Sequence, residues 1–555
     1  MNKIFSFVLL LLFLLLTDSL LSQPKLNVQA SLNNTLRYGS GLENRSGQEF
    51  SKEYFEDLAD ARIKVNDFVL GFRYEISDPI EYGLNFKGIR KRYLEYSNLT
   101  EGISVRAGDF WDIVGRGLTL NLFENRPLVY DTGIDGVRVS LKRSFGEKNP
   151  IKIKAQIIAG NIDYNDFLNF QRKEKYKLRD GNFEISPLKF LTLGTNYIYS
   201  TGEILSNDLT TTTDIEAYLP EGYINFIFSE FQFFASYAHK HVNTKPSFLY
   251  PVPLNAKGDG FYASVSYSKP KIGVTLDYKN YRFDITTPDN QATDRPTKML
   301  PFQNPPTALK EHVSTLISRN PHVVDFNDEV GGQLDILYSP NDKLSFNINL
   351  AIASKHYEYV DFDTTSKIIY TRVDRKTDFI PSLDDSFSPF WEVYVESEYY
   401  VTDNFYFRIG VSKQSSVLYN QLVPSASEKI FYTTIPTEFR YSITKDYTLK
   451  LNAEHQWGHN SIRHTDKNFM SDYFALTLSR SPNLSVTGNI EFTTDEEDPS
   501  GKKFWALGEV AYKITPKHTL TVSYGSERGG LKCTSGICRY VNPFNGFRLT
   551  VSSIF

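Results

Sequence analysis

Long apolar runs are missing from almost the whole of this sequence. After Gln23, no run approaches the roughly 18 consecutive apolar residues that a transmembrane helix needs. The exception is Ile4–Leu16, which follows Lys3 and is too short to span a membrane. This layout is typical of a secretory signal, so we expect residues 1–22 to be a signal peptide, with an uncleaved anchor helix as the alternative. The protein is therefore expected to be exported, and to enter a membrane only as strands.

Methionine and tryptophan are rare, with 3 and 4 residues, whereas the chain has 35 tyrosines and 41 phenylalanines. The mean hydropathy is nevertheless negative, at -0.35. A soluble domain of this length needs a thick apolar core. A membrane barrel needs apolar residues only at every second strand position, with aromatic residues at both water interfaces. The chain also lacks an excess of positive charge, since its net charge is -4, so we expect no nucleic-acid partner.

Apolar and polar residues alternate in many short stretches. Residues 151–157 read IKIKAQI, residues 344–350 read LSFNINL and residues 449–454 read LKLNAE. This period of two predicts strands with one apolar and one polar face. A face with a charged residue at every second position must face water rather than lipid. A soluble sandwich gives the same alternation with its apolar face inside, so periodicity alone leaves both folds open.

Short and long connections alternate along the chain, and this pattern separates the two folds. Turn residues cluster in short segments such as 66–67, 146–150 and 229–230. Long polar stretches lie between such turns, at 39–55, 113–133, 284–328, 359–387 and 526–543. The connection at 77–79 is an exception, because it is short at a place where the alternation predicts a long loop. Outer-membrane barrels have short turns at one end and long loops at the other.

These features predict an all-β fold. We expect residues 23–555 to form a single transmembrane antiparallel β-barrel of about 24 strands, within a range of about 20 to 26, with inward-folded loops. No linker or composition break divides this range. The first strand is expected to begin by about Leu26, with no separate plug domain before it, which argues against a TonB-dependent receptor.

The segment Gly108–Gly136 is too apolar for a freely solvated loop, because it contains Trp111, Leu118, Leu120 and other large apolar residues. A hairpin folded into the lumen would bury them. The charged residues that we expect to form a lumen constriction are Asp109, Arg116, Glu124, Arg126 and Asp131. An extended strand pair with a salt-bridged inner wall is the alternative.

A second long loop contains a helix signal. Thr307 follows two prolines as a candidate cap, apolar residues from Leu309 to Ile317 fall on one helix face, and Asn320–Pro321 ends the pattern. We expect a short amphipathic helix that packs into the mouth of the barrel. His312 and His322 are candidate metal ligands, but isolated histidines are more often ordinary polar residues, so no metal or cofactor site is predicted.

The only two cysteines, Cys533 and Cys538, lie in the last long loop. An exported protein is in an oxidising compartment, so we expect a structural disulfide between them. A metal site would need further thiols or histidines nearby, and a redox enzyme would favour a tighter pair in a βαβ context. The predicted disulfide is therefore structural and stabilises this loop locally.

The chain closes on the alternating segment Phe544–Phe555. Phe547, Leu549, Val551 and Phe555 share one face. This segment looks like the closing strand of an outer-membrane barrel, in which that strand is also the assembly signal read by the insertion machinery, although Ser553 departs from the usual large apolar residue. An ordinary amphipathic strand is the alternative.

Three segments together carry a resemblance to a known family: GDFWDIVGRGLTLNLFENRPL, NPPTALKEHVSTLISRNPHVVDFNDEVG and RGGLKCTSGICRYVNPFNGFRLTVSSIF. The chain resembles an uncharacterised family of outer-membrane proteins, a domain of unknown function, from Bacteroidota and related bacteria. The resemblance implies the outer membrane of a Gram-negative bacterium and supplies no substrate.

The sequence favours a porin-like or substrate-selective channel with a loop-constricted lumen. The alternative is a non-conducting scaffold or assembly barrel that binds a partner. No catalytic triad order, phosphate loop or distinct carboxylate pair is found, so we do not expect an enzyme. The expected partners are outer-membrane lipid, the barrel-insertion machinery, and either small solutes or an envelope protein.

Overall fold

The computed structural model describes residues 27–45, 47–165, 173–205, 212–245, 255–283, 300–364, 367–375, 377–420 and 423–555. The predicted signal peptide, residues 1–22, lies outside the described residues. Within them, the longest helices are single turns, and none is long and apolar enough to cross a membrane.

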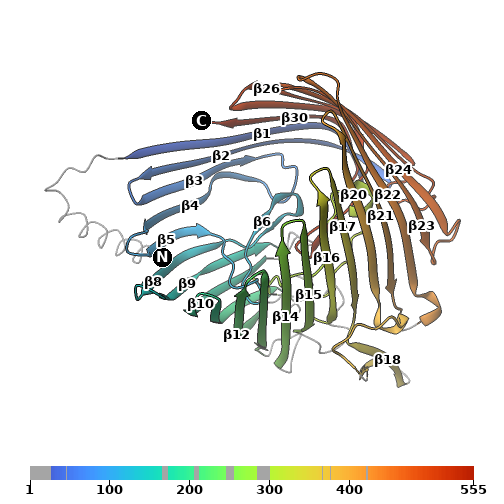
Figure 1. Cartoon of the computed structure of the whole chain (residues 1–555). Coiled ribbons are helices and arrows are strands. Elements are labelled where there is room, and N and C mark those ends of the chain that lie inside the picture. The colour runs from blue at the N-terminus through green and yellow to red at the C-terminus, as the bar shows by residue number, and fades with distance from the viewer. Residues whose placement is uncertain are drawn as a thin grey trace.

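Within the described ranges, 24 strands form one antiparallel sheet (Figure 1). Each strand pairs with its neighbours along the chain, and β1 (Val28–Arg45) pairs with β30 (Phe544–Ile554), which closes the sheet into a barrel. The other strands are β2 (Gln48–Val65), β3 (Phe68–Ser77), β4 (Phe86–Asn98), β5 (Ile103–Phe110), β8 (Ile134–Phe145), β9 (Ile151–Asn165), β10 (Lys173–Leu188), β11 (Leu191–Leu205), β12 (Thr212–Phe228), β13 (Phe231–Thr244), β14 (Asn255–Lys269), β15 (Ile272–Arg282), β16 (Glu329–Asn341), β17 (Leu344–Ser354), β20 (Phe390–Thr402), β21 (Phe405–Leu418), β22 (Glu428–Ser442), β23 (Tyr447–Asn460), β24 (Asn468–Arg480), β25 (Leu484–Thr493), β26 (Phe504–Thr515) and β27 (His518–Glu527).

The two faces of the sheet differ in polarity. In β3, Leu70 and Phe72 point outward and are 47% and 38% exposed. Further along the strand, Arg73 and Glu75 point inward and form ion pairs. A closed sheet with an exposed apolar outer face and a polar inner face is a transmembrane barrel, because a soluble sandwich buries its apolar face. The predicted fold class and strand number are confirmed.

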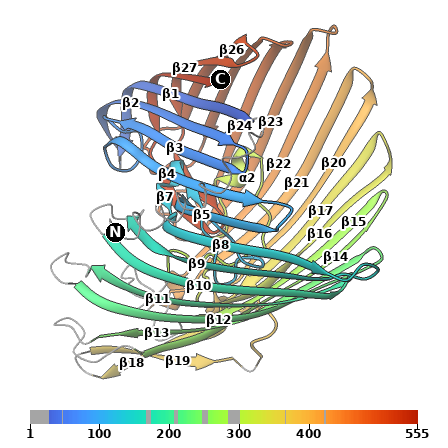
Figure 2. The same cartoon turned by 90° about the vertical axis from the view of Figure 1, so that its left-hand side faces the viewer.

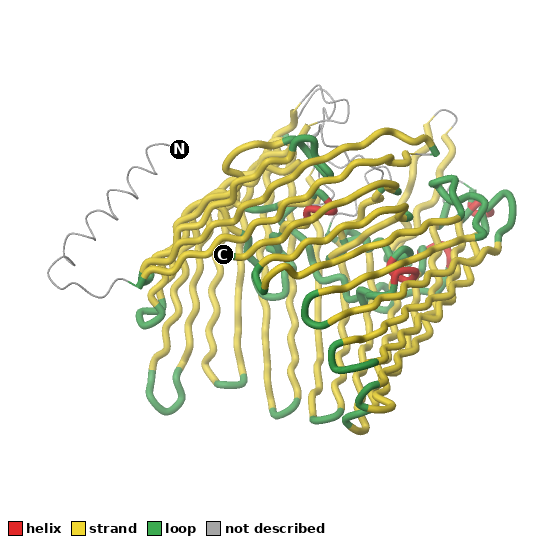
Figure 3. Tube along the Cα trace, turned by 90° about the horizontal axis from the view of Figure 1, so that it is seen from above, coloured by secondary structure: helices red, strands yellow, loops and turns green. Residues whose placement is uncertain are grey.

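The barrel has a turn end and a loop end. At the turn end the connections are short, as at Asn66–Asp67 and at Ser229–Glu230, where Asn66 and Ser229 adopt positive φ angles. At the loop end lie β6 (Glu124–Asn125), η1 (Arg126–Leu128), β7 (Tyr130–Asp131), α2 (Thr315–Ser318), β18 (Tyr357–Thr364), β19 (Lys367–Asp374), η3 (Asp385–Phe387), η4 (Pro424–Ala426), β28 (Gly530–Thr534) and β29 (Ile537–Val541). Figure 3 shows that helix is limited to short turns within these loops.

One predicted loop is wrong. Residues 39–55 were expected to be a long polar connection, but β1 and β2 pair without a break from Val28 opposite Val65 to Arg45 opposite Gln48. In this part of the two strands most residues at both parities are polar, such as Ser40, Glu43 and Lys52. The alternation that marks a strand is therefore absent from this part of the sequence although the hydrogen-bond ladder continues.

Candidate functional site

Three loops fold into the barrel and contact one another. We name residues 111–133 loop A, residues 300–328 loop B and residues 528–543 loop C, and we call the three together the plug. Loops A and B are joined by hydrogen bonds from Asn121 N to Phe302 O (2.9 Å) and from Asn304 Nδ2 to Asn121 O (2.8 Å). Loop C joins loop B through Ser535 N, which donates to Glu311 Oε1 at 2.8 Å. The predicted inward-folded loops are confirmed.

The plug packs against one side of the barrel through apolar side chains. Leu118 and Leu120 of loop A and Phe302 of loop B are all 0% exposed. They belong to a single buried cluster with inward-facing residues of β9 to β15, such as Ile158 and Ile198. Burying apolar side chains of this size stabilises the contact by about 1.5–3 kcal/mol each. The apolar residues that made loop A unsuitable for free solvation are therefore covered by the barrel wall.

Loop A meets the wall of β2 to β4 through charges. Arg126 Nη2 lies 3.1 Å from Glu56 and its Nη1 lies 3.2 Å from Glu75, while Glu124 lies 2.8 Å from Arg73 Nη1. Glu56 and Glu75 are almost fully buried, so each carboxylate requires a cation near it. We call this group of ion pairs the first clamp.

Asp131 adds a further ion pair to the first clamp. Its carboxylate lies 2.7 Å from Lys91 Nζ and accepts hydrogen bonds from Trp111 Nε1 (3.0 Å) and Gly133 N (2.9 Å). Burial alone would raise the pKa of Asp131, but Lys91 and these N–H donors hold that pKa below its usual value. In contrast, burial raises the pKa of Glu81, in the short loop after β3, despite its ion pair with Arg37 (2.8 Å).

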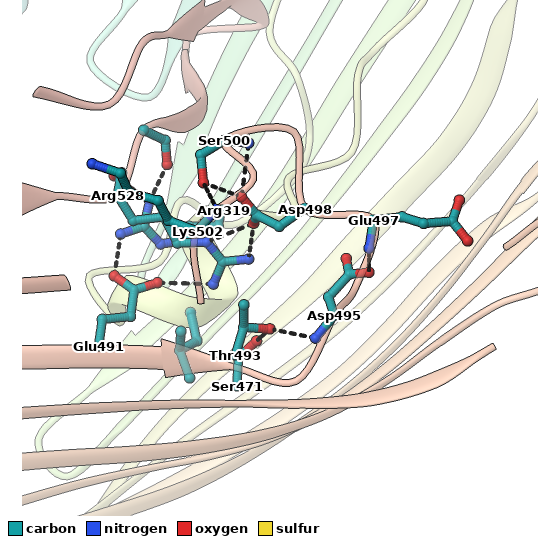
Figure 4. Close-up of polar contacts among 12 residues, drawn as sticks. Arg319, Ser471, Glu491, Thr493, Asp495, Glu497, Asp498, Ser500, Lys502 and Arg528 are labelled. Carbon is teal, nitrogen blue, oxygen red and sulfur yellow. Dashed lines mark hydrogen bonds and ion pairs between the residues drawn. The ribbon is translucent and has the colours of Figure 1, made fainter. Parts of the chain in front are cut away.

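A second clamp holds loops B and C to the wall of β25 (Figure 4). Glu491 of β25 pairs with Arg319 of loop B and, at 3.0 Å, with Arg528 of loop C. Arg528 also lies 2.8 Å from Asp498, and Arg319 Nη1 donates to Arg528 O at 2.9 Å. Burial lowers the pKa of Arg528, but Glu491 and Asp498 outweigh it and hold that pKa above its ordinary value. Two arginines from different loops thus share one carboxylate of the wall.

The single helical turn of loop B sits on a wall carboxylate. Ser314 Oγ, Thr315 N and Leu316 N all donate to Glu454 of β23, at 2.7, 2.8 and 2.7 Å. Figure 2 shows α2 inside the barrel, close to β23. Glu454 therefore accepts from backbone groups that a helix start leaves without partners.

The predicted start of this helix at Thr307 is wrong. Residues 301–313 are not helical, and wall side chains bind two carbonyl groups at the expected helix start: Lys279 Nζ donates to Thr307 O at 2.6 Å and Tyr281 OH donates to Pro306 O at 2.7 Å. Val313, expected on the apolar helix face, is 84% exposed. Loop B is therefore an extended strap with one helical turn.

The predicted constriction residues lie in different places. Glu124, Arg126 and Asp131 lie in the first clamp. Arg116 lies apart from them, exposed, with its guanidinium 5.3 Å from the centre of the Phe234 ring. Asp109 alternates with Phe110 along β5, so it lies on the opposite face from the buried cluster, and it accepts from Arg92 N at 2.7 Å.

Cys533 and Cys538 are bonded to each other across the β28–β29 hairpin of loop C. In that hairpin Gly536 has φ +78° and lies against the Phe326 ring, where a Cβ would come within 2.2 Å of the ring. The hairpin therefore packs on loop B.

Phe547, Leu549 and Val551 share one face of β30, as alternation requires, and Phe555 stacks edge-on against His518 at 5.2 Å. Their role as an assembly signal stays a prediction.

No sequence pattern predicts the second clamp. Its members are single charges on separate strands and loops, and Glu491 looks like any inward polar residue of an alternating strand. Three cavities, of about 270, 130 and 200 Å³, lie along loop B, and Arg319 or His322 lines each of them. Within the described residues, no three His, Cys, Asp or Glu side chains are grouped to hold a metal ion.

Comparison with solved structures finds similar barrels at low identity. The siderophore receptor PirA from Pseudomonas aeruginosa matches with a TM-score of 0.43 and 9% identity over 96% of this chain and 81% of that chain. The copper transporter OprC matches with a TM-score of 0.41 and 11% identity over 95% and 80%. The FrpB iron transporter from Neisseria meningitidis matches with a TM-score of 0.39 and 10% identity over 95% and 83%. No curated protein matches the chain.

The resemblance to an uncharacterised family is confirmed. The family model described as "Family of unknown function (DUF6029)" matches residues 1–555, and the chain belongs to that family.

Proposed function

We propose that the protein is an outer-membrane channel of a Gram-negative bacterium, in which the plug narrows a wide lumen to a selective path. The observation that carries this proposal is the difference between the two halves of the lumen. At the loop end, Glu56 and Glu491 of the inner face are buried against the plug. Toward the turn end, Arg62 lies on the same inner face of β2 as Glu56, and Glu509 of β26 lies on the same inner face as Glu491. Both Arg62 and Glu509 are exposed. A water-filled vestibule thus leads to a plug held by ion pairs.

The chemistry of the clamps supports a path that admits solutes selectively. A barrel of 24 strands would be a wide opening without a plug. Charges of both signs line the remaining surface, and charged rings in a narrow lumen discriminate among ions and small polar solutes. The arginines of the clamps keep part of their side chains exposed, 26% for Arg126 and 17% for Arg319, so water can reach them when a pair separates. We therefore expect the clamps, rather than the apolar cluster, to yield when a solute passes.

Conductance of purified protein in a planar bilayer tests this proposal. We expect small stepwise openings for the unaltered protein, and larger steps for Glu491→Gln, which removes the acid shared by Arg319 and Arg528. The matched control is Arg92→Gln, because Arg92 and Asp135 form a 3.5 Å pair that is about half exposed. A silent bilayer for both the unaltered protein and Glu491→Gln, with folded barrel shown by heat-modifiable migration, would contradict the proposal.

A partner-binding barrel is the second candidate function. The observation behind it is the β18–β19 hairpin, which forms a two-stranded sheet of its own and extends away from the barrel at the loop end (Figure 1). Deleting residues 359–372 tests it by crosslinking in native membranes. A stoichiometric partner lost with the hairpin would favour the scaffold, whereas unchanged crosslinking would leave the channel as the better explanation.

A further inference from the structure

A fourth loop lies against the outside of the barrel wall rather than in the lumen. We name residues 377–389 loop D; it follows the β18–β19 hairpin at the loop end of the barrel and leads into β20 (Figure 1). On β15, Lys279 and Tyr281 point inward, because both donate hydrogen bonds to loop B. Tyr278 and Asn280 alternate with them and therefore point outward. Loop D bonds to these two outward side chains, so it lies on the outer face of the wall.

Three contacts hold loop D to β15. Tyr278 OH donates to Phe379 O at 2.7 Å, and Asn280 Nδ2 donates to Asp378 O at 3.1 Å. The carboxylate of Asp378 also lies 2.9 Å from Arg282 Nη1. Two of the three contacts use backbone carbonyl groups of loop D. They therefore fix the course of the chain and leave the side chain of Phe379 exposed.

The next part of loop D is held to β17. Ser382 N donates to Ser354 Oγ at 2.9 Å. The strand register places Ser354 in one row with Asn280 of β15 and Val330 of β16, so all three point outward. Val330 is nevertheless fully buried. Residues 378–382 thus cross the outer face from β15 to β17 and run over β16 between them.

This crossing lies at the edge of the lipid-facing band that is nearer the loop end. Closer to the turn end, Leu276 of β15, Leu334 of β16 and Leu350 of β17 form one outward row. Leu276 and Leu350 are exposed, as lipid-facing side chains are in an isolated barrel. Beyond Leu276 the outward residues of β15 become polar, from Tyr278 to Arg282. An aromatic side chain followed by polar ones is typical of the interface between hydrocarbon and water.

Loop D exposes large apolar side chains at this interface. Phe379, Ile380 and Leu383 are 67%, 68% and 64% exposed. The polar groups of the loop are engaged elsewhere, since Asp378 pairs with Arg282 and Asp385 pairs with Lys429 of β22. Loop D is therefore a short amphipathic segment that lies across the strands at the boundary of the lipid-facing band.

We propose that loop D is a lipid anchor, in which Phe379, Ile380 and Leu383 insert into the membrane leaflet at the loop end. The occupant of this surface is the acyl-chain region of the lipid. The three side chains continue a band that already faces lipid, and interfacial segments bind membranes through buried apolar area with their polar groups toward water. A protein partner fits less well, because a stable interface usually uses about 20–30 residues on each side.

The anchor has a consequence for the neighbouring hairpin. β19 ends at Asp374, directly before loop D, and Arg375 Nη1 donates to Ser354 Oγ at 3.0 Å. An anchored loop D therefore holds the base of the β18–β19 hairpin beside the membrane surface. This inference rests on the membrane barrel and not on conduction, since the anchor serves a channel and a scaffold equally.

Spin labelling of the refolded full-length protein in phosphatidylcholine vesicles tests the proposal. The two cysteines of the chain are bonded to each other, so an introduced cysteine carries the label. A nitroxide is placed at Ile380→Cys, at Leu276→Cys as the lipid-facing reference, and at Ser425→Cys, in the exposed η4 turn, as the water-facing reference. Collision with oxygen, which concentrates in hydrocarbon, is compared with collision with a water-soluble nickel chelate.

We expect the label at position 380 to collide more with oxygen than with the chelate, as at position 276, and the label at position 425 to show the reverse. If Ile380→Cys fails to fold, Leu383→Cys has the same expected result. A label in loop D that behaves like the one at position 425 would overturn the proposal. Protection from both oxygen and the chelate would also overturn it, and would show that a second copy or another protein covers loop D.

Discussion

The plug contacts opposite sides of the barrel by different physical means. On the side of β9 to β15 it buries leucine, isoleucine and aromatic side chains in one cluster. On the sides of β2 to β4 and of β25 it makes the ion pairs of the two clamps. Apolar burial is non-directional, whereas each ion pair joins two particular groups and depends on their protonation. We therefore expect substitutions on the two sides of the plug to have different effects.

The largest expected effect comes from the apolar side. Leu120→Ala removes a fully buried side chain, and such a change costs about 2–5 kcal/mol because a cavity is left. Ile113→Ala in the same loop is the control, since Ile113 is 52% exposed. We expect Leu120→Ala to make loop A sensitive to added protease while the strands remain folded. Equal protection of both variants would show that the cluster does not anchor the loop.

A smaller effect is expected on the charged side. Glu491→Gln leaves Arg319 and Arg528 without their shared acid, although Arg319 still donates to Arg528 O. Hydrogen bonds to charged groups contribute about 1.5–3 kcal/mol. We expect loops B and C to exchange backbone hydrogens faster, with loop A unchanged. The exposed pair of Lys503 and Glu496 gives the control, Glu496→Gln, for which no change is expected. Simultaneous release of loop A would show that the two sides are not separate.

How far the sequence predicts this arrangement depends on the kind of interaction. Alternation and turn spacing predict the barrel, because side-chain direction along a strand is a local property. The apolar residues Leu118 and Leu120 also predict that loop A folds inward. The clamps depend on which inward charges face which loop, and Arg126 reaches Glu56 across 70 residues. Patterns that are local in sequence cannot specify such distant partners, and for the same reason the extended form of residues 301–313 was not foreseen.

Removing the disulfide tests the contribution of loop C to the plug. Changing Cys533 and Cys538 together to serine releases a very short ring, which should cost about 2 kcal/mol at most. Because Gly536 packs on Phe326, we expect the change to loosen loop B locally rather than open the barrel. Mass spectrometry of unreduced protein and hydrogen exchange of loop B check this expectation. Loss of folded barrel in the double variant would show that the bond supports more than the plug.

The smallest expected effect is a pH dependence of the first clamp, on the order of 1 kcal/mol for a partly exposed pair. Lys91 and nearby N–H donors hold the pKa of Asp131 below its ordinary value of 3.8. The folded protein therefore binds this proton more weakly than the unfolded chain does. The stabilisation is fully present above about pH 3.8, and it is lost as the pH falls through the lower pKa of the folded state.

Asp131→Asn should thus reduce protection of loop A from protease at pH 7, and the difference from the unaltered protein should vanish in strong acid. The pKa of Glu81 is shifted in the opposite direction from that of Asp131, since burial raises it above 4.5. A raised carboxyl pKa opposes folding as the pH rises above 4.5, so Glu81→Gln should cost less at pH 7 than Asp131→Asn. If Glu81→Gln were the more damaging change at pH 7, the ion pair of Glu81 with Arg37 would outweigh its burial, and the first clamp would extend to that loop.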